Sequence, residues 1–269
     1  MATTVDEFEE LLNVEQQVDL PKLALAAKHG IPDKVRQGVW FILLNVQHSD
    51  KLANLDNVSH AELHFIKNLR GEVRRYFNRR SSEFNSKEAA SLMEQVLTLY
   101  FCNHHSKAYS ASFVSIIGPL VYVFNSDQLV YGAFSKVVSY IDDWFANEDL
   151  DQQISNFLMM FRLLLPDLYN HFQDEEVDIR EWLSSWFETI LSKQLPLDSI
   201  LRLWDTYFSS TEKLSMHSYV CLSILHHCKD DLEELDQSEI HSYLNRLPLM
   251  NMDAIILHAY QLKAMNENS

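Results

Sequence analysis

The sequence has few of the residues that interrupt regular structure: 5 glycines and 6 prolines among 269 residues. Proteins built from sheets need turn residues between short strands, and their strands alternate polar and apolar side chains. No stretch of this chain alternates for long enough to indicate a strand. The sequence therefore predicts an all-helical protein with short connections, arranged in one or two lobes.

Cysteine and positive charge are scarce as well. The three cysteines do not form a disulfide framework by number or spacing, which is typical of a reducing compartment. The 22 basic residues face 38 acidic ones, and the net charge of −16 excludes general affinity for nucleic acid, whose phosphates bind lysine and arginine. The same balance argues against direct binding to an anionic membrane surface.

Long apolar runs are absent. No uninterrupted apolar stretch reaches the roughly 18 residues that a membrane-spanning helix requires. The N-terminus is acidic, whereas a signal peptide has a basic start and an apolar core. We therefore expect a cytoplasmic protein without a transmembrane segment, which reaches endomembranes only through a protein partner.

The common enzyme signatures are also missing, since the chain has no glycine-rich phosphate loop, no Gly-x-Ser-x-Gly, no His-Glu-x-x-His and no Cys-x-x-Cys. Cys102 lies near His104 and His105, and residues 226–228 read His-His-Cys. Neighbouring helical residues point in different directions, so each cluster offers one or two metal ligands at best. We expect no metal and no cofactor, with core cysteines and surface histidines instead.

Apolar residues recur at helical spacing along almost the whole chain. A polar loop is expected at residues 47–59, and the acidic runs at 142–151, 174–178 and 230–239 are interpreted as solvated loops or helix ends. The predicted helices are residues 6–12, 22–28, 59–80, 86–101, 128–144, 154–172, 179–193, 213–228, 238–247 and 252–264, with further helices opening at Pro32-Asp33, after Tyr109 and at Pro196.

Residues 103–124 form the central stretch of the chain. After Tyr109 come three small residues, at 110–112, and then a run that is apolar on most faces, which predicts a buried helix with an open first turn. Gly118-Pro119 interrupts the hydrogen-bond ladder of this helix and is expected to kink it.

Basic residues concentrate in the helix predicted for residues 59–80. Arginine stays charged and offers a planar, forked set of donors, so a guanidinium outside the buried face of this helix can reach a partner's phosphate. The other interpretation is a solvated face paired with the acidic loops. The six basic residues are Lys67, Arg70, Arg74, Arg75, Arg79 and Arg80.

Two further segments resemble the signatures of TBC domains, the fold of Rab GTPase-activating proteins. Residues 29–40 are similar to the family's opening Gly-Ile-Pro, arginine and Val-Trp, and residues 195–208, with a Trp-Phe upstream, are similar to its late Arg-Leu-Trp-Asp. The resemblance implies an all-α, two-lobed, V-shaped domain over residues 20–265, after a short helical extension at 1–19. The residues that carry it are Gly30, Pro32, Arg36, Trp40, Trp186, Arg202, Trp204 and Asp205.

In that family an arginine inserts beside the nucleotide, and charge supplied in this way is worth on the order of 10³–10⁵ in hydrolysis rate. Residues 69–77 resemble the arginine motif, with Arg75 at the finger position and Arg74 as the alternative one residue earlier. Glu72 stands where the family has aspartate, and Tyr76 where it has threonine.

The family's second catalytic motif is tyrosine-x-glutamine-glycine-methionine, whose glutamine positions the attacking water. Residues 109–113 align with it, and Gly118-Pro119-Leu120 aligns with the alanine/serine-proline-leucine that follows. Tyr109 is kept, but Ala111 replaces the glutamine. Alanine has no side-chain donor or acceptor and cannot orient a water molecule. The resemblance places Tyr109, Glu72 and Arg70 along the groove that binds the GTPase.

Two functions follow from the resemblance. The first is a protein that binds GTP-bound small GTPases of the Rab class, or serves as an adaptor or complex subunit in membrane trafficking or signalling, with impaired GTPase activation because Ala111 replaces the glutamine. The alternative is an active GTPase-activating protein that combines Arg75 with the GTPase's own glutamine.

Overall fold

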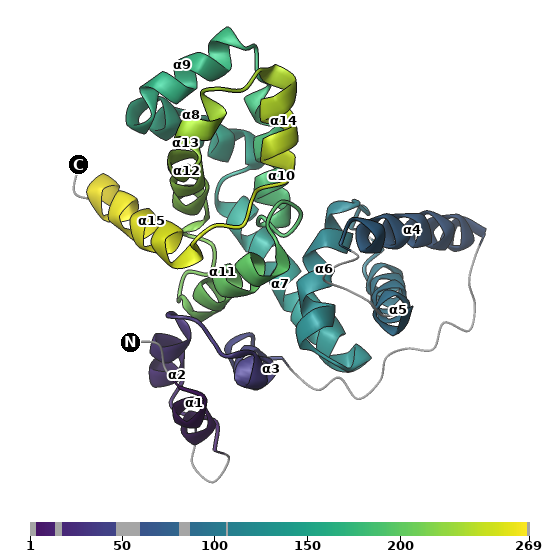
Figure 1. Ribbon diagram of the computed structural model, residues 1–269. Helices are drawn as coiled ribbons and strands as arrows, with labels where there is room; N and C mark the ends of the chain where they lie inside the picture. Colours follow the sequence, from purple (N-terminus) through teal and green to yellow (C-terminus); the bar gives the residue numbers. More distant parts are fainter. Residues whose placement is uncertain (1–3, 14–17, 47–59, 81–86, 106, 268–269) are drawn as a thin grey trace. The chain divides into compact units, whose positions relative to one another are not determined.

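The structure is a computed structural model that describes residues 4–13, 18–46, 60–80, 87–105 and 107–267. Every regular element in these ranges is an α-helix, which confirms the all-helical fold class (Figure 1). The loop predicted at residues 47–59 lies outside the described residues. None of the described helices is both long enough and apolar enough to cross a membrane.

The chain folds into two compact units. One, here called the N-terminal unit, is built from the described parts of Thr4–Leu23 and Ile31–Ser139. The other, here called the C-terminal unit, is built from Ala24–Gly30 and the described chain from Tyr140 onward.

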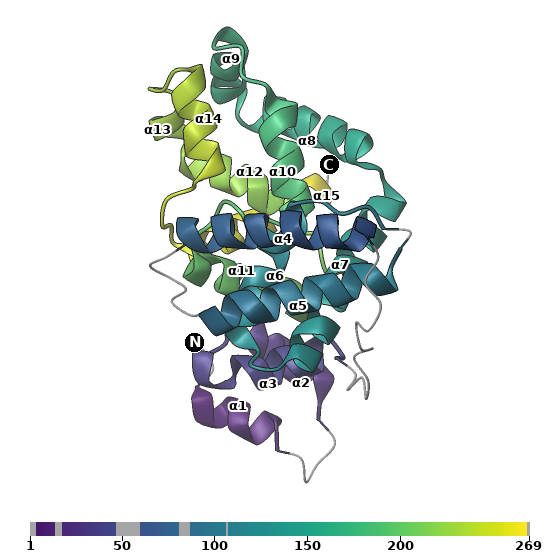
Figure 2. The same ribbon diagram turned by 90° about the vertical axis from the view of Figure 1, so that its right-hand side faces the viewer.

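Within the N-terminal unit, α4 and α5 lie side by side and both pack on α6 (Figure 2), while α1 packs on α3. Residues 114–121 of α6 are all buried, which confirms the prediction of a buried central helix. This helix continues past Gly118-Pro119, so the proline lies inside it. The helices of this unit are α1 (Val5–Leu11), α3 (Asp33–Leu43), α4 (His60–Arg79), α5 (Lys87–Asn103), α6 (Ser112–Val123) and the first part of α7 (Asp127–Asn147).

The C-terminal unit has an aromatic core to which α8 and α10 contribute, with Trp182, Trp186 and Phe157 fully buried. α12 packs along α15, and α10 contacts α8, α12 and α14. The complete helices after α7 are α8 (Leu150–Leu164), α9 (Pro166–Asp174), α10 (Ile179–Thr189), α11 (Leu197–Ser209), α12 (His217–His227), α13 (Lys229–Leu232), α14 (Gln237–Asn245) and α15 (Met252–Glu267). α2 (Leu20–Ala27) ends in this unit.

Several predicted helix boundaries are wrong, and the helix expected from residue 154 already begins at Leu150. The single helix expected for residues 154–172 is two helices, because Pro166 has no N–H to continue α8 and instead starts α9. The helix expected for 179–193 ends at Thr189, where Ile190 and Leu191 adopt left-handed backbone conformations with φ of 44° and 64°. The helix expected for 213–228 begins only at His217.

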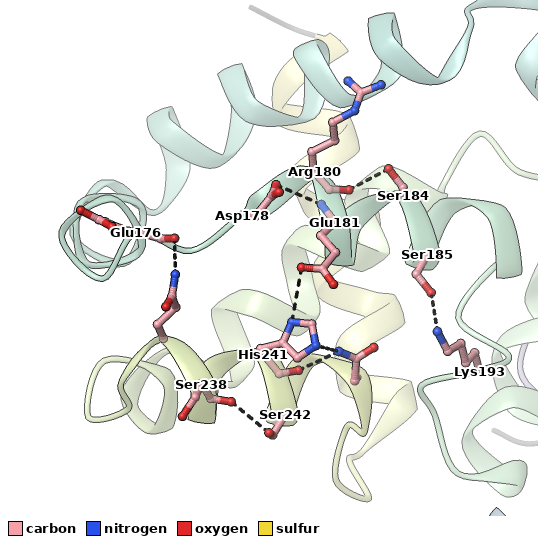
Figure 3. Close-up of polar contacts among 12 residues, drawn as sticks. Glu176, Asp178, Arg180, Glu181, Ser184, Ser185, Lys193, Ser238, His241 and Ser242 are labelled. Carbon is pink, nitrogen blue, oxygen red and sulfur yellow. Dashed lines mark hydrogen bonds and ion pairs between the residues drawn. The ribbon is translucent and has the colours of Figure 1, made fainter.

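The acidic runs cap helices and link them, as their interpretation as helix ends implies. The Asp178 carboxylate accepts the backbone N–H of Glu181 (3.2 Å) at the start of α10. Glu181 in turn lies 3.8 Å from the His241 ring on α14 (Figure 3). Gln237, also on α14, donates its side-chain amide to the Glu176 carbonyl (2.7 Å). Asp178 therefore stabilises the N-terminus of α10 by accepting one of its free backbone N–H groups.

The late signature residue Arg202 joins three segments of the C-terminal unit. Its Nε donates to Asp253 of α15 (2.7 Å), and its two terminal nitrogens donate to Thr206 (2.8 Å) and to the Lys28 carbonyl (3.3 Å). Gly30 has φ of +102°, and a Cβ there would lie 3.2 Å from the Arg202 side chain. The backbone conformation and the close approach explain the glycine at this position.

The other signature residues are structural too. Arg36, on α3, is buried and donates to the Asp33 carboxylate and the Ile31 carbonyl. Pro32 immediately precedes α3, and Trp40 is fully buried. In the C-terminal unit, Trp186 donates its indole N–H to the Leu244 carbonyl (3.0 Å), Trp204 donates to the Ile190 carbonyl (3.4 Å), and Asp205 is fully buried.

A buried histidine connects α10, α11 and α12. The ring of His217 contacts the Tyr207 hydroxyl through Nδ1 (2.7 Å) and the Trp186 carbonyl through Nε2 (3.1 Å). A carbonyl can only accept, so Nε2 carries the proton and Nδ1 accepts from Tyr207. Burial lowers the pKa of His217 from 6.5 to about 4. The ring is therefore neutral in the folded protein at neutral pH.

Because His217 is buried and neutral, we expect it to lower the free energy of unfolding in acid. Between pH 6.5 and about 4 the unfolded chain binds a proton at His217 that the folded chain excludes, so the free energy of unfolding falls as the pH drops, by on the order of 3 kcal/mol. We expect His217→Gln, although itself destabilised, to lose this part of the pH dependence. Urea unfolding across this pH range measures it, with His241→Gln as an exposed control. Equal pH slopes for wild type and His217→Gln would contradict the assignment.

Candidate functional site

The arginine motif lies on α4, whose buried and exposed faces follow directly from the sequence. Leu69, Val73 and Tyr76 are buried at helical spacing against the unit's core. Arg74 and Arg75 therefore fall on the outer surface, and the Arg75 side chain is 62% exposed. An arginine in this position is accessible to a partner protein.

Glu72 holds Arg75 from one turn away on the same helix. Its two carboxylate oxygens accept from Nε (3.3 Å) and from a terminal nitrogen of Arg75, in a forked arrangement. These hydrogen bonds raise the pKa of the Arg75 guanidinium. Glu72 itself is only 29% exposed. Glu72 therefore orients the Arg75 guanidinium at the surface of α4, and its carboxylate balances the charge of the arginine in the unbound domain.

The two neighbouring candidates, Arg70 and Arg74, differ in the ion pairs that they make. Arg70 pairs with Glu94 of α5 (3.0 Å) and so links the two helices at their surface, where an ion pair contributes little to stability. Arg74 is exposed and makes no ion pair with any residue in the part of the chain that the structure describes.

Tyr109 lies within electrostatic range of Arg75 and Glu72. Its ring packs edge-on against Phe65 of α4 (5.1 Å between centroids) and Phe101 of α5 (5.3 Å). Burial and then the Glu72 charge raise the pKa of Tyr109 to about 12, while the Arg75 charge lowers it. The hydroxyl is buried and has no hydrogen-bond partner among the described residues. The structure thus brings Tyr109, Arg75 and Glu72 together.

Ala111 lies two residues further along, directly before α6. It is exposed and its side chain caps nothing. The hydroxyls of Ser110 and Ser112 hydrogen-bond to each other (3.1 Å). The segment that leads into α6 therefore carries short side chains, with Ala111 exposed among them.

One pair of residues in this region was not identified from the sequence. Tyr76 is only 2% exposed, and a Cβ added at Gly118 would lie 1.9 Å from its hydroxyl oxygen. The sequence alone indicates a kink at Gly118 and an imperfect match to the arginine motif at Tyr76. Two features of the sequence could have indicated this contact: the aromatic residue next to Arg75 and the glycine inside a helix predicted to be buried.

Metal and thiol chemistry find no support in the described residues. No three His, Cys, Asp or Glu side chains among them gather closely enough to hold a metal ion. Cys221 and Cys228 are buried free thiols, and burial raises the pKa of both. A thiol with a raised pKa is a poor nucleophile.

Comparison with known proteins decides the family. The model of the Rab-GTPase-TBC domain matches residues 33–233. The chain belongs to the Rab-GTPase-TBC domain family.

Individual TBC proteins agree with this assignment. TBC1 domain family member 22A from Macaca fascicularis is 24% identical, over 97% of this chain and 63% of its own length. The solved Ypt/Rab-GAP domain of Gyp1p superimposes with a TM-score of 0.71 at 19% identity, over 98% of this chain and 97% of that one. The Chlamydomonas flagellar RabGAP TBC domain gives 0.72 at 18% identity, over 95% and 89%. This chain spans less than two thirds of the length of its curated TBC relatives.

The Tyr109 hydroxyl gives a prediction that separates folding from binding in this TBC domain. Since the buried hydroxyl has no hydrogen-bond partner in the described part of the chain, we expect Tyr109→Phe to change the free energy of unfolding by less than about 0.5 kcal/mol, or to stabilise the fold. Tyr109→Ala removes the ring packing on Phe65 and Phe101 and should cost about 2 kcal/mol or more. Chemical denaturation measures both. A large destabilisation by Tyr109→Phe would show that the hydroxyl has a structural partner.

Proposed function

We propose that this TBC domain binds GTP-bound small GTPases of the Rab class and has impaired ability to activate them. The observation that carries the proposal is the combination of an exposed, charged Arg75 with Ala111 at the open start of α6. Arg75 can supply positive charge to a nucleotide phosphate. The Ala111 side chain has no hydrogen-bond donor or acceptor, so it cannot orient the attacking water.

The geometry supports Arg75 over Arg74 as the inserting residue. Glu72 holds Arg75 by hydrogen bonds, and Arg75 lies within electrostatic range of Tyr109. Tyr109 belongs to the segment that resembles the glutamine motif, so this link favours Arg75 as the residue that acts with it. Arg74 has no such connection. Arginine is suited to this role because its forked donors match phosphate oxygens and its charge is permanent.

Similarity to GTPase-activating proteins also supports the choice of partner. The family match names Rab GTPases, and one of the similar structures is a Ypt/Rab-GAP domain. We place the protein at endomembranes through such a partner, as an adaptor or complex subunit in trafficking or signalling. The alternative function, an active GTPase-activating protein, is favoured by one observation, the exposure of Arg75, and requires the GTPase's own glutamine to place the water.

Restoring the missing glutamine tests the proposal. In single-turnover GTP hydrolysis by a panel of Rab GTPases, we expect the wild-type protein to stimulate weakly or not at all. Ala111→Gln should raise the stimulation at least about tenfold, because it adds a side chain that can orient water. Adding Arg75→Ala to this variant should abolish the gain, whereas Arg74→Ala, a matched control one residue earlier, should retain it.

The other outcomes distinguish the alternatives. Strong stimulation by the wild-type protein that is lost in Arg75→Ala would establish the active enzyme. No stimulation by Ala111→Gln, together with no Arg75-dependent binding to any GTP-bound Rab, would contradict the proposal and favour a scaffold that uses another surface.

A further inference from the structure

Tyr76 directly follows Arg75 on α4. The Arg75 side chain is exposed, whereas the Tyr76 side chain is buried in the N-terminal unit. Its ring lies over Gly118 of α6 at a distance that leaves no space for a side chain there. A Cβ at residue 118 would lie 1.9 Å from the hydroxyl oxygen, 2.4 Å from Cζ and 2.9 Å from Cε1 of Tyr76. Contacts this short do not occur between real atoms, so α4 approaches α6 this closely because residue 118 is glycine.

The ring is also confined by its other neighbours. The Arg80 guanidinium stands 5.4 Å from the ring centroid, and the Phe77 ring packs against it edge-on at 5.8 Å. On the other side, residues 114–121 of α6 are all buried. The Tyr76 ring is therefore held between these neighbours and a buried segment of α6. The contact therefore acts as a fixed reference point between α4 and α6.

We infer that Tyr76 is a positioning residue whose contact with Gly118 sets the height and rotation of α4 on α6, and hence where Arg75 stands relative to Tyr109. Arg75 and Tyr76 are consecutive in a helix, so a displacement of one displaces the other. Tyr109 belongs to the segment that leads into α6, while Arg75 belongs to α4. The inference rests on the proposed function, since it is there that the position of Arg75 matters.

A thermal-unfolding series tests the contact without any GTPase. In the wild-type background, Gly118→Ala should lower Tm by roughly 3–10 °C through overpacking. In the Tyr76→Phe background it should remain destabilising, because Cζ and Cε1 still block the added Cβ. In the Tyr76→Thr background the same substitution should raise Tm or leave it unchanged, since the space is open and alanine favours a helix over glycine. An equal loss in all three backgrounds would overturn the inference.

A kinetic series tests the positioning role in the Ala111→Gln protein at a temperature where every variant is folded. Tyr76→Phe should keep the stimulated rate because its ring fills the same space. Tyr76→Thr and Gly118→Ala should each lose at least about tenfold. A retained rate in the conservative Tyr76→Phe variant, together with the loss in the two folded variants, separates the positioning of Arg75 from a general structural defect.

Different results would contradict the contact and the positioning role. Undiminished rates for folded Tyr76→Thr and Gly118→Ala would overturn the positioning role. If the Ala111→Gln protein stimulates no GTPase, the proposed function fails, and the sign of the Gly118→Ala effect in the Tyr76→Thr background still decides whether Tyr76 and Gly118 form the contact.

Discussion

The candidate site depends on how closely α4 approaches α6. Arg75 is carried by α4, whereas Tyr109 and Ala111 precede α6, so the packing of these two helices decides whether they can act together. At this interface the Tyr76 ring lies so close to Gly118 that no side chain would fit at residue 118. Because the segment around Gly118 is buried on all sides, its backbone provides a firm surface for α4. The exposed residues of the site are thus supported by a core contact directly beneath them.

In the proposed function, the site above this contact lacks the glutamine that would orient water. Arg75 keeps its charge and is oriented by Glu72, and Tyr109 keeps its ring packed against two phenylalanines. The position that would orient water is an exposed alanine. On the proposed function, such a site would attract a nucleotide phosphate without directing its hydrolysis. Binding and catalysis can therefore separate within one domain.

Most of the fold could be predicted from helical periodicity and the two signature segments, because these report which face of each helix is buried. Periodicity does not report where a helix stops, so Pro166 was overlooked and the left-handed Ile190 and Leu191 could not be anticipated. Periodicity also does not show how closely two helices approach each other. Tyr76 and Gly118 each differ from the family motif, and only their approach in space shows that the two differences are complementary. For the same reason Gly30 was recognised as a signature, but its contact with Arg202 was not.

The most direct test of the account is a structure of this domain bound to a Rab GTPase that carries GDP and aluminium fluoride, a mimic of the transferring phosphate. We expect Arg75 to leave Glu72 and donate to the fluoride or the β-phosphate, with Tyr109 beside it and no side chain from residue 111 touching the water position. A complex in which the GTPase docks on another surface, with Arg75 still paired to Glu72 and remote from the nucleotide, would contradict it.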